Sequence, residues 1–313
     1  MQRVRITGVG RYLPKRLLNN TELPALDKPI TDEQIERIGV HSRGWASDEE
    51  SIDHMAAAAA LSALEAAGRS AKDLDFIVLA NWTQRRFFPD FAARVQHRLD
   101  APQAFAFDVS TACAGFAFGA GVARGLLQLP QNKIGLVVAS ETTSRRARPQ
   151  SKATLVFGDA AGAWVVEGGE GAGGELLDVE LMTDGRHADA MEIDEHGHVR
   201  THIDQKTLQN LAIHSFRTAS DRVLDRAGLT LDDLDWIVPH SGTAGIQALL
   251  LRTLKVDPAK VLVNFPEVGN VSSAAIPVAL DDFMKRGIIK SGDLILSPTT
   301  GSGWYAAAML YRA

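Results

Sequence analysis

The sequence predicts an α/β protein made of two similar halves, and three observations lead to this prediction. Segments with helical and strand-like patterns alternate along the chain. A stretch around Leu64 returns 160 positions later, around Leu224, with the same residue types in the same order. The chain has 313 residues, whereas a single hydrophobic core usually stops growing near 250–300 residues, roughly.

The first copy of the repeat begins with a helix. Met55 to Ala67 is rich in alanine and leucine, which favour a helix, and Gly68 is a typical C-terminal stop. The apolar run Phe76 to Ala80 follows as a predicted strand. Eight residues of this stretch meet an identical residue 160 positions later: Leu64, Ala67, Gly68, Asp73, Leu74, Asp75, Ile77 and Val78. The constant spacing indicates a duplicated α/β unit, because solenoid repeats are only about 20–50 residues long.

The same spacing continues downstream. Ser110 to Ala114 falls opposite Asn270 to Ala274, and each segment opens a run of small residues that favours a helix. Ile134 to Val138 falls opposite Leu294 to Pro298, and both follow a turn and are typical of buried parallel strands. The glycine-rich stretch 168–174 is the natural joint. We therefore expect an N-terminal half at residues 1–168 and a C-terminal half at residues 169–313. If the glycines form an ordinary hairpin turn inside the second half, the boundary moves by a few residues.

Composition restricts the classes of function. A net charge of −5 and a pI near 6.0 give no broad basic field, so we expect no nucleic-acid partner. The chain lacks an uninterrupted run of about 18 apolar residues, and Met1 to Gly10 alternates like a strand. We therefore expect a cytoplasmic protein that does not bind membranes. One cysteine excludes an internal disulfide and leaves either a small buried hydrophobe or a reactive thiol.

That cysteine, Cys113, lies where a predicted strand runs into a helix rich in alanine and glycine. Unsatisfied N–H groups at a helix start favour a thiolate over a thiol. Two polar residues occupy related places in the second half. His240 follows the predicted strand Trp236 to Pro239, and Asn270 opens a helix opposite Ser110. Each residue alone is typical of a structural role, but together the three indicate a catalytic set.

Five segments, taken in order, resemble the β-ketoacyl-ACP synthase III family, where ACP is acyl carrier protein. They are Ile6 to Pro14, Asp108 to Phe116, Phe157 to Ala163, Val238-Pro239-His240 with Gly269-Asn270, and Gly301 to Trp304. The resemblance covers essentially the whole chain. It implies a thiolase-like fold, with two duplicated α/β halves in a five-layered αβαβα arrangement, and a homodimer. It also implies a Cys-His-Asn catalytic set that carries over to Cys113, His240 and Asn270.

The resemblance implies a reaction in two steps. Cys113 takes an acyl group from acyl-CoA or acyl-ACP and forms an acyl-enzyme. Malonyl-ACP then loses CO₂ and condenses with that acyl group, while His240 and Asn270 donate to the enolate oxygen. The backbone N–H groups of Cys113 and Ser302 hold the oxyanion. No metal or organic cofactor is expected. Two alternatives stay open: a non-condensing acyltransferase that passes the acyl group to a hydroxyl or amine, and a silent partner in a heterodimeric synthase.

Further positions are assigned to the substrate by the same resemblance: Arg37, Thr143, Arg145, Phe157 and Thr243. Phe88 is expected to reach across the dimer and close the partner's pocket; a locally packed aromatic is the alternative. Three residues depart from the family: Gln34 replaces the tryptophan that stacks on the adenine of acyl-CoA, Thr243 replaces an asparagine, and Ser302 replaces the middle glycine of a triplet. These departures predict a changed acyl donor or acceptor.

Two groups of polar residues have an open function. Arg146 and Arg148 form either a solvated rim that docks an acidic carrier protein or a partner for the carboxylate of a dicarboxylic starter such as glutaryl. Four histidines gather in one segment: His187, His196, His198 and His202. Because no cysteine is nearby, we interpret this segment as a polar flap beside the substrate and not as a metal site.

Overall fold

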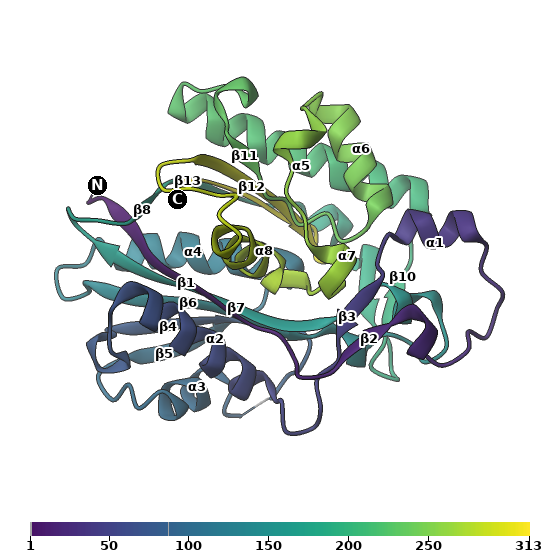
Figure 1. Ribbon diagram of the computed structural model, residues 1–313, viewed down its shortest axis with the longest axis horizontal. Helices are drawn as coiled ribbons and strands as arrows, with labels where there is room; N and C mark the ends of the chain where they lie inside the picture. Colours follow the sequence, from purple (N-terminus) through teal and green to yellow (C-terminus); the bar gives the residue numbers. More distant parts are fainter. Residues whose placement is uncertain (1, 87) are drawn as a thin grey trace.

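Helices and sheets alternate in five layers in the computed structural model, which describes residues 2–86 and 88–313 (Figure 1). Helices α2 and α3 form one outer layer and helices α5 and α6 the other; α4 and α8 lie between the sheet layers. The first half contains β1 (Val4–Tyr12), α2 (Ile52–Ala67), β4 (Phe76–Ala80), α3 (Ala92–Arg98), β5 (Phe105–Val109), α4 (Gly115–Leu126), β6 (Ile134–Thr142) and β7 (Asp159–Gly168). The five-layered α/β arrangement predicted from the sequence is therefore confirmed.

The second half follows a similar order, with the short helix α7 (Phe265–Val268) in the place of strand β5. It contains β8 (Gly174–Thr183), α5 (Gln205–Ala227), β11 (Trp236–Ile237), α6 (Ala244–Leu254), α7, α8 (Ala275–Lys285), β12 (Leu294–Gly301) and β13 (Tyr305–Arg312). Shorter elements surround the core: β2 (Leu17–Asn19), α1 (Asp32–Ile38), β3 (Ser42–Gly44), β9 (Met191–Ile193) and β10 (Val199–Thr201). The boundary expected at residues 168–169 lies at the end of β7.

The strands of the core form one hydrogen-bonded sheet in the order β11-β12-β13-β8-β1-β7-β6-β4-β5. Strand β4 pairs in parallel with β5 and β6, and β11 pairs in parallel with β12, as expected for the two equivalent strand pairs. Only two residue pairs, Arg5 with Glu175 and Ile6 with Gly174, join β1 to β8. The sheets of the two halves therefore meet along a short ladder at one edge.

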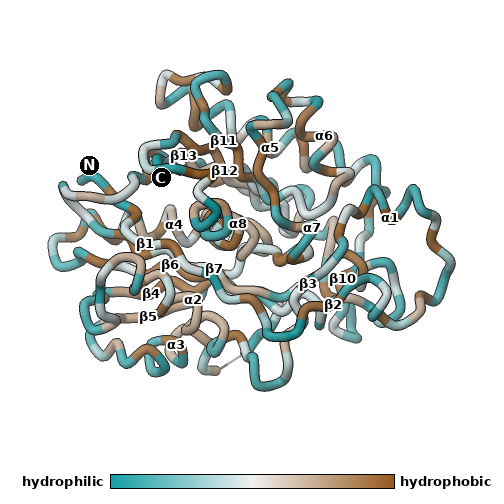
Figure 2. The backbone as a smooth tube through the Cα atoms, in the orientation of Figure 1, coloured by the Kyte–Doolittle hydropathy of each residue, from teal (hydrophilic) through white to brown (hydrophobic). Residues whose placement is uncertain are grey.

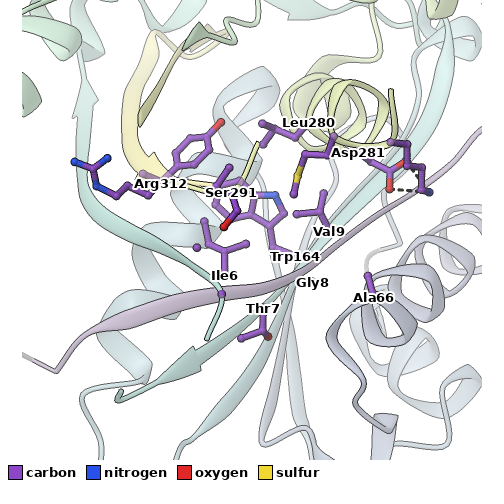
Figure 3. Close-up of a pocket in the computed structure, with 16 residues that line it drawn as sticks. Ile6, Thr7, Gly8, Val9, Ala66, Trp164, Leu280, Asp281, Ser291 and Arg312 are labelled. Carbon is purple, nitrogen blue, oxygen red and sulfur yellow. Dashed lines mark hydrogen bonds and ion pairs between the residues drawn. The ribbon is translucent and has the colours of Figure 1, made fainter. Parts of the chain in front are cut away.

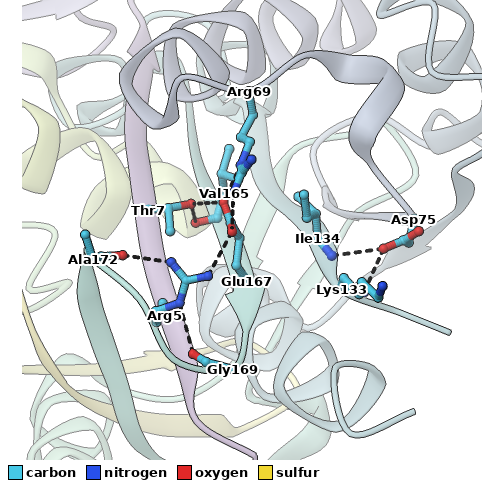
Figure 4. Close-up of polar contacts among 10 residues, drawn as sticks. All are labelled: Arg5, Thr7, Arg69, Asp75, Lys133, Ile134, Val165, Glu167, Gly169 and Ala172. Atoms are coloured by element: carbon cyan, nitrogen blue, oxygen red, sulfur yellow. Dashed lines mark hydrogen bonds and ion pairs between the residues drawn. The ribbon is translucent and has the colours of Figure 1, made fainter. Parts of the chain in front are cut away.

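An aspartate shared by both copies explains part of the repeat. Asp75 precedes β4, and its Oδ2 accepts from the N–H groups of Lys133 at 2.7 Å and Ile134 at 2.9 Å (Figure 4). Asp235 precedes β11, and its Oδ2 accepts from the N–H of Leu294 at 2.8 Å. Each carboxylate therefore fixes the start of the neighbouring parallel strand, β6 or β12, and so sets its register.

An ion-pair cluster holds the end of β7 to its neighbours. Glu167 is buried and accepts from Arg5 of β1 at 2.9 Å and from Arg69, just beyond α2, at 2.8 Å (Figure 4). The Oγ1 of Thr7 also donates to Glu167, at 3.0 Å. The hydrogen bonds from Arg69 are the main reason why the pKa of Glu167 lies below its ordinary value.

The apolar segments follow the sheet and the helices packed against it (Figure 2). Trp164 of β7 is fully buried and packs edge-on against Phe116 of α4 and Tyr311 of β13.

A cavity of about 400 Å³ lies where β1, α8 and the end of β13 meet (Figure 3). Its described lining includes none of the predicted catalytic residues. Within residues 2–86 and 88–313, no helix has the length and apolar character that crossing a bilayer requires.

Candidate active site

The turn that carries Cys113 connects β5 to the central helix α4. The 3₁₀ turn η3 (Ala112–Ala114) runs directly into α4, so Cys113 lies at a helix start, as the sequence predicts. Ala112 has a φ of 47°, which is an unusual conformation for a residue with a Cβ. Thr299 Oγ1 of β12 donates to the Cys113 carbonyl at 3.2 Å. The turn is therefore held by both halves of the protein.

The structure brings the predicted catalytic and oxyanion residues to one cavity of about 230 Å³, where Cys113, His240, Asn270 and Ser302 all contribute to the lining. Most of the remaining lining is apolar and includes Trp82, Phe157, Met191, Ile193, Phe216 and Trp304. A largely apolar cavity with a few converging polar groups is the usual form of a small-molecule site.

His240 and Asn270 lie side by side against one glycine. A methyl group added at Gly242 would lie 2.6 Å from Asn270 Nδ2 and 3.7 Å from His240 Cε1. The Asn270 backbone is fixed from the facing segment, because its N–H donates to Val156 O at 2.8 Å and its carbonyl accepts from Thr143 Oγ1 at 2.8 Å. The amide and the imidazole therefore have a fixed arrangement at the cavity wall.

Burial determines the resting charges of the site. It raises the pKa of the Cys113 thiol to about 11; a hydrogen bond from Ser272 opposes this shift, and the Glu141 carboxylate adds to it. Burial also lowers the pKa of His240 to about 4. Both groups are therefore neutral near pH 7, and the helix start alone does not ionise the thiol.

Three residues that the sequence analysis missed act on the sulfur: Ser272 directly, Trp82 through Ser272, and Glu141 through its charge. Ser272 Oγ donates to Cys113 Sγ at 3.2 Å, and Trp82 Nε1 donates to Ser272 Oγ at 2.6 Å. Glu141 is fully buried and accepts from Thr83 Oγ1 at 2.7 Å. Burial raises its pKa to about 7 against the effect of these hydrogen bonds. For Ser272, the repeat offered a signal in the sequence: it lies 160 positions after Ala112, the neighbour of Cys113.

The residues predicted to bind substrate are divided between the cavity and the surface. Phe157 lines the cavity, and Thr143 lies behind Asn270. Arg37 is exposed on α1, and Arg145 Nη2 donates to Ser47 O at 3.0 Å. Thr243 is the N-cap of α6, where its Oγ1 accepts from Ile246 N at 3.4 Å. The structure does not bring these last three to the cavity, and their substrate roles stay predictions.

The histidine-rich segment includes a flap, residues 191–201, that covers one side of the cavity through Met191, Ile193 and Val199. Arg146 holds the flap: its Nη1 donates to Gly197 O at 2.9 Å, and its Nε donates to Thr83 O. Ser302 Oγ also donates to Met191 O at 2.8 Å.

Other polar residues near the flap have partners of their own. Arg148 pairs with Asp27 at 2.8 Å and lies outside the cavity lining. His187 contacts Asp184, and His202 contacts Glu192. In the described part of the chain, no three His, Cys, Asp or Glu side chains are grouped to hold a metal ion.

Comparison with known proteins agrees with the fold. The family model of 3-oxoacyl-[acyl-carrier-protein] synthase III matches residues 107–185, and the model of its C-terminal part matches residues 224–313. A β-ketoacyl-[acyl-carrier-protein] synthase III of Dinoroseobacter shibae is 37% identical over 99% of both chains. The crystal structure of the synthase III of Aquifex aeolicus superimposes with a TM-score of 0.92, at 33% identity, over 99% of this chain and 100% of that one.

A second solved structure is the priming β-ketosynthase of the R1128 polyketide pathway. It gives a TM-score of 0.90 at 31% identity over 99% of this chain and 96% of that one. The fold and the cavity around Cys113 define an enzyme of the thiolase-fold ketoacyl synthase class. Within that class, the chain belongs to the β-ketoacyl-ACP synthase III family.

Proposed function

We propose that the protein condenses an acyl thioester primer with malonyl-ACP through an acyl-Cys113 intermediate. The observation that carries this proposal is the single cavity onto which Cys113, His240, Asn270 and Ser302 open. Membership of the synthase III family supports the same reaction.

The first half-reaction transfers the acyl group. A ring nitrogen of His240 takes the thiol proton while Cys113 Sγ attacks the thioester carbonyl carbon. The carbonyl oxygen becomes an oxyanion, which the backbone N–H groups of Cys113 and Ser302 receive. Collapse of this intermediate breaks the carbon–sulfur bond to the carrier, and the leaving thiolate takes the proton back from His240. The product is an acyl-enzyme in which one difficult transfer has been divided into two steps.

The second half-reaction makes the new carbon–carbon bond. Malonyl-ACP loses CO₂, and the electron pair of the broken bond forms an enolate. The neutral imidazole of His240 and the amide of Asn270 donate to the enolate oxygen; the low pKa of His240, about 4, keeps the ring neutral for this task. The enolate carbon attacks the acyl carbonyl, and Cys113 leaves as a thiolate that takes up a proton.

The partners follow from this reaction. An acyl carrier protein presents malonate, and either CoA or the carrier protein delivers the primer. We also propose a homodimer in which Phe88 enters the partner's cavity. The Phe88 side chain is 93% exposed in the single chain, and Phe105, 46% exposed, lies on β5 at the end of the sheet order. Two measurements on Phe88→Ala test this point. Sedimentation should show that the variant stays dimeric, and competition between acyl primers should show that it has lost primer selectivity. Unchanged selectivity would refute the placement of Phe88.

Transfer to a hydroxyl or amine needs Cys113 and His240 but not two donors to an enolate oxygen, so the position of Asn270 favours condensation over that alternative.

Two measurements test the proposal. The intact mass of the protein after incubation with acyl-CoAs and acyl-ACPs shows whether Cys113 is acylated, and CO₂ release from malonyl-ACP shows whether condensation follows. Asn270→Ala should release CO₂ about 10²–10³-fold more slowly, with a much smaller loss, about tenfold at most, in the acylation of Cys113. Acylation without CO₂ release in the wild-type protein would show simple acyl transfer. A Cys113 that takes up no acyl group would indicate a silent partner.

A further inference from the structure

A chain of two hydrogen bonds ends at the sulfur of Cys113. The first runs from Trp82 Nε1 to Ser272 Oγ and measures 2.6 Å, and the second runs from Ser272 Oγ to Cys113 Sγ and measures 3.2 Å. An indole N–H is a donor only. Because it occupies an acceptor site of the Ser272 hydroxyl, the single hydroxyl proton is directed towards the sulfur.

The backbone of Ser272 is set for this contact. Its φ is 53°, a conformation that serine rarely adopts, and the residue is 2% exposed. Asn270 Oδ1 accepts from Ser272 N at 2.9 Å. The side chain that faces the enolate in the proposed reaction therefore also fixes the turn that aims Ser272 at Cys113.

The site needs a donor at this place. Burial and the Glu141 carboxylate both disfavour the thiolate, and the Ser272 hydrogen bond is the main opposing influence. Because the pKa of His240 is about 4, the resting site holds no imidazolium that could stabilise a thiolate. A hydrogen bond to a charged acceptor is about twice as strong as one between neutral groups.

We propose that Ser272 is a further catalytic residue, which donates a hydrogen bond to the Cys113 thiolate, and that Trp82 is a positioning residue, which aims that hydroxyl. The proposal rests on the nucleophilic role of Cys113. Ser272 gives up no atom in this role. The thiol proton is transferred to His240, and the hydroxyl proton of Ser272 stays on its oxygen. When the sulfur is acylated the hydrogen bond weakens, and it strengthens again as the thiolate is released.

The test measures alkylation of the thiol by iodoacetamide from pH 6 to 11. The chain has one cysteine, so all of the signal belongs to Cys113. Ser272→Ala and Ser272→Gly should both move the alkylation profile to higher pH and slow the reaction at pH 8 about tenfold. Glycine adopts a positive φ without strain, so Ser272→Gly should show this loss without loss of thermal stability. Trp82→Phe keeps the ring but removes the donor, and should slow alkylation about threefold.

A matched control lies in the same protein. Trp304 Nε1 donates to Ser215 Oγ at 3.1 Å, a second tryptophan–serine pair with no hydrogen bond to the sulfur in the described structure. Ser215→Ala should leave the alkylation profile unchanged. Wild-type profiles for both Ser272 variants would overturn the proposal even if the enzyme condenses. Shifted profiles in a protein that forms no acyl-enzyme would instead refute the proposed function and leave the Ser272 contact standing.

Discussion

Ala112 and Ser272 lie 160 positions apart, and both have a positive φ, 47° and 53°, although neither is a glycine. Each is the first residue of a 3₁₀ turn that leads into a central helix: Ala112–Ala114 before α4 in the first half, and Ser272–Ala274 before α8 in the second. The first turn presents the Cys113 sulfur, and the second presents the hydroxyl that donates to it. The duplicated backbone therefore supplies both partners of one hydrogen bond.

This conformation makes Ala112 sensitive to side-chain shape. Ala112→Val should lower the free energy of unfolding by about 1–3 kcal/mol, because a β-branched residue is strongly disfavoured at positive φ. Ala112→Gly should be more stable than the Val variant by about 1 kcal/mol or more, since glycine accepts this φ. Urea unfolding measures both. Equal stabilities of the two variants would contradict the assignment of the strain to the backbone.

Gly301 leaves room beside the proposed oxyanion site. A methyl group there would lie 2.7 Å from Cys113 N and 3.1 Å from Ala114 N. Gly301→Ala should lower kcat/KM by about 10² or more, the loss typical when an oxyanion donor is removed. Gly125→Ala on α4 is the control, because its methyl group would meet nothing within 4 Å. It should keep full activity and gain about 0.5–1 kcal/mol of stability.

The buried imidazole of His240 makes stability depend on pH. Its pKa falls from 6.5 to about 4 on folding, so the unfolded chain binds a proton between these values that the native protein does not. Taken alone, this group lowers the free energy of unfolding by up to about 3 kcal/mol as the pH falls from 6.5 to 4. Glu141, whose pKa is raised to about 7, contributes in the opposite sense over this range. His240→Asn should therefore differ from the wild type by a stability gain that grows as the pH falls from 6.5 to 4, measured by urea unfolding. Asn270→Ala alters the same cavity without removing a titrating group and should show no such pH-dependent difference.

Glu141 should act on the thiol in the opposite sense to Ser272. Its pKa is raised to about 7, so it is ionised above that pH, and its charge then disfavours the Cys113 thiolate. Glu141→Gln should therefore speed alkylation of Cys113 at pH 8 by roughly threefold or more and change it little at pH 6. Glu195→Gln removes a carboxylate whose side chain is 87% exposed, and it should leave the rate as it is in the wild type.

Arg146 holds the flap by donating to Gly197 O and Thr83 O. Arg146→Ala should raise KM about tenfold for butyryl and glutaryl thioesters alike, with less change in kcat, because the freed flap exposes the cavity. Arg148→Ala breaks only an exposed pair with Asp27 and should behave as the wild type. A loss confined to glutaryl thioesters would support the pairing with a dicarboxylic starter instead.

The sequence predicts the layers well because the repeat has a physical basis in the chain. Asp75 and Asp235 are identical at the spacing of 160, and each carboxylate fixes the start of a neighbouring parallel strand. The catalytic set could be predicted from the sequence because its members lie at recognisable ends of elements: Cys113, His240 and Asn270 all follow strands or open helices.

The residues around the sulfur were harder to predict. Trp82 lies in a loop about thirty positions before Cys113, and Ser272 is one serine in a run of small residues. Their hydrogen bonds exist only after both halves have packed together. Likewise, resemblance placed Arg145 and Thr243 at the substrate, but in the single chain their contacts are with Ser47 and the start of α6.

The two central helices begin beside each other: a methyl group at Gly115, the first residue of α4, would lie 3.3 Å from Ser273 Cβ at the turn before α8. Each helix start carries roughly half an elementary positive charge. Together they place about one unit of positive charge in the middle of a protein whose formal net charge is −5. Lysine and arginine are absent from the described residues that line the cavity. In the proposed reaction, these helix starts therefore favour each anion in turn: the thiolate, the oxyanion and the enolate.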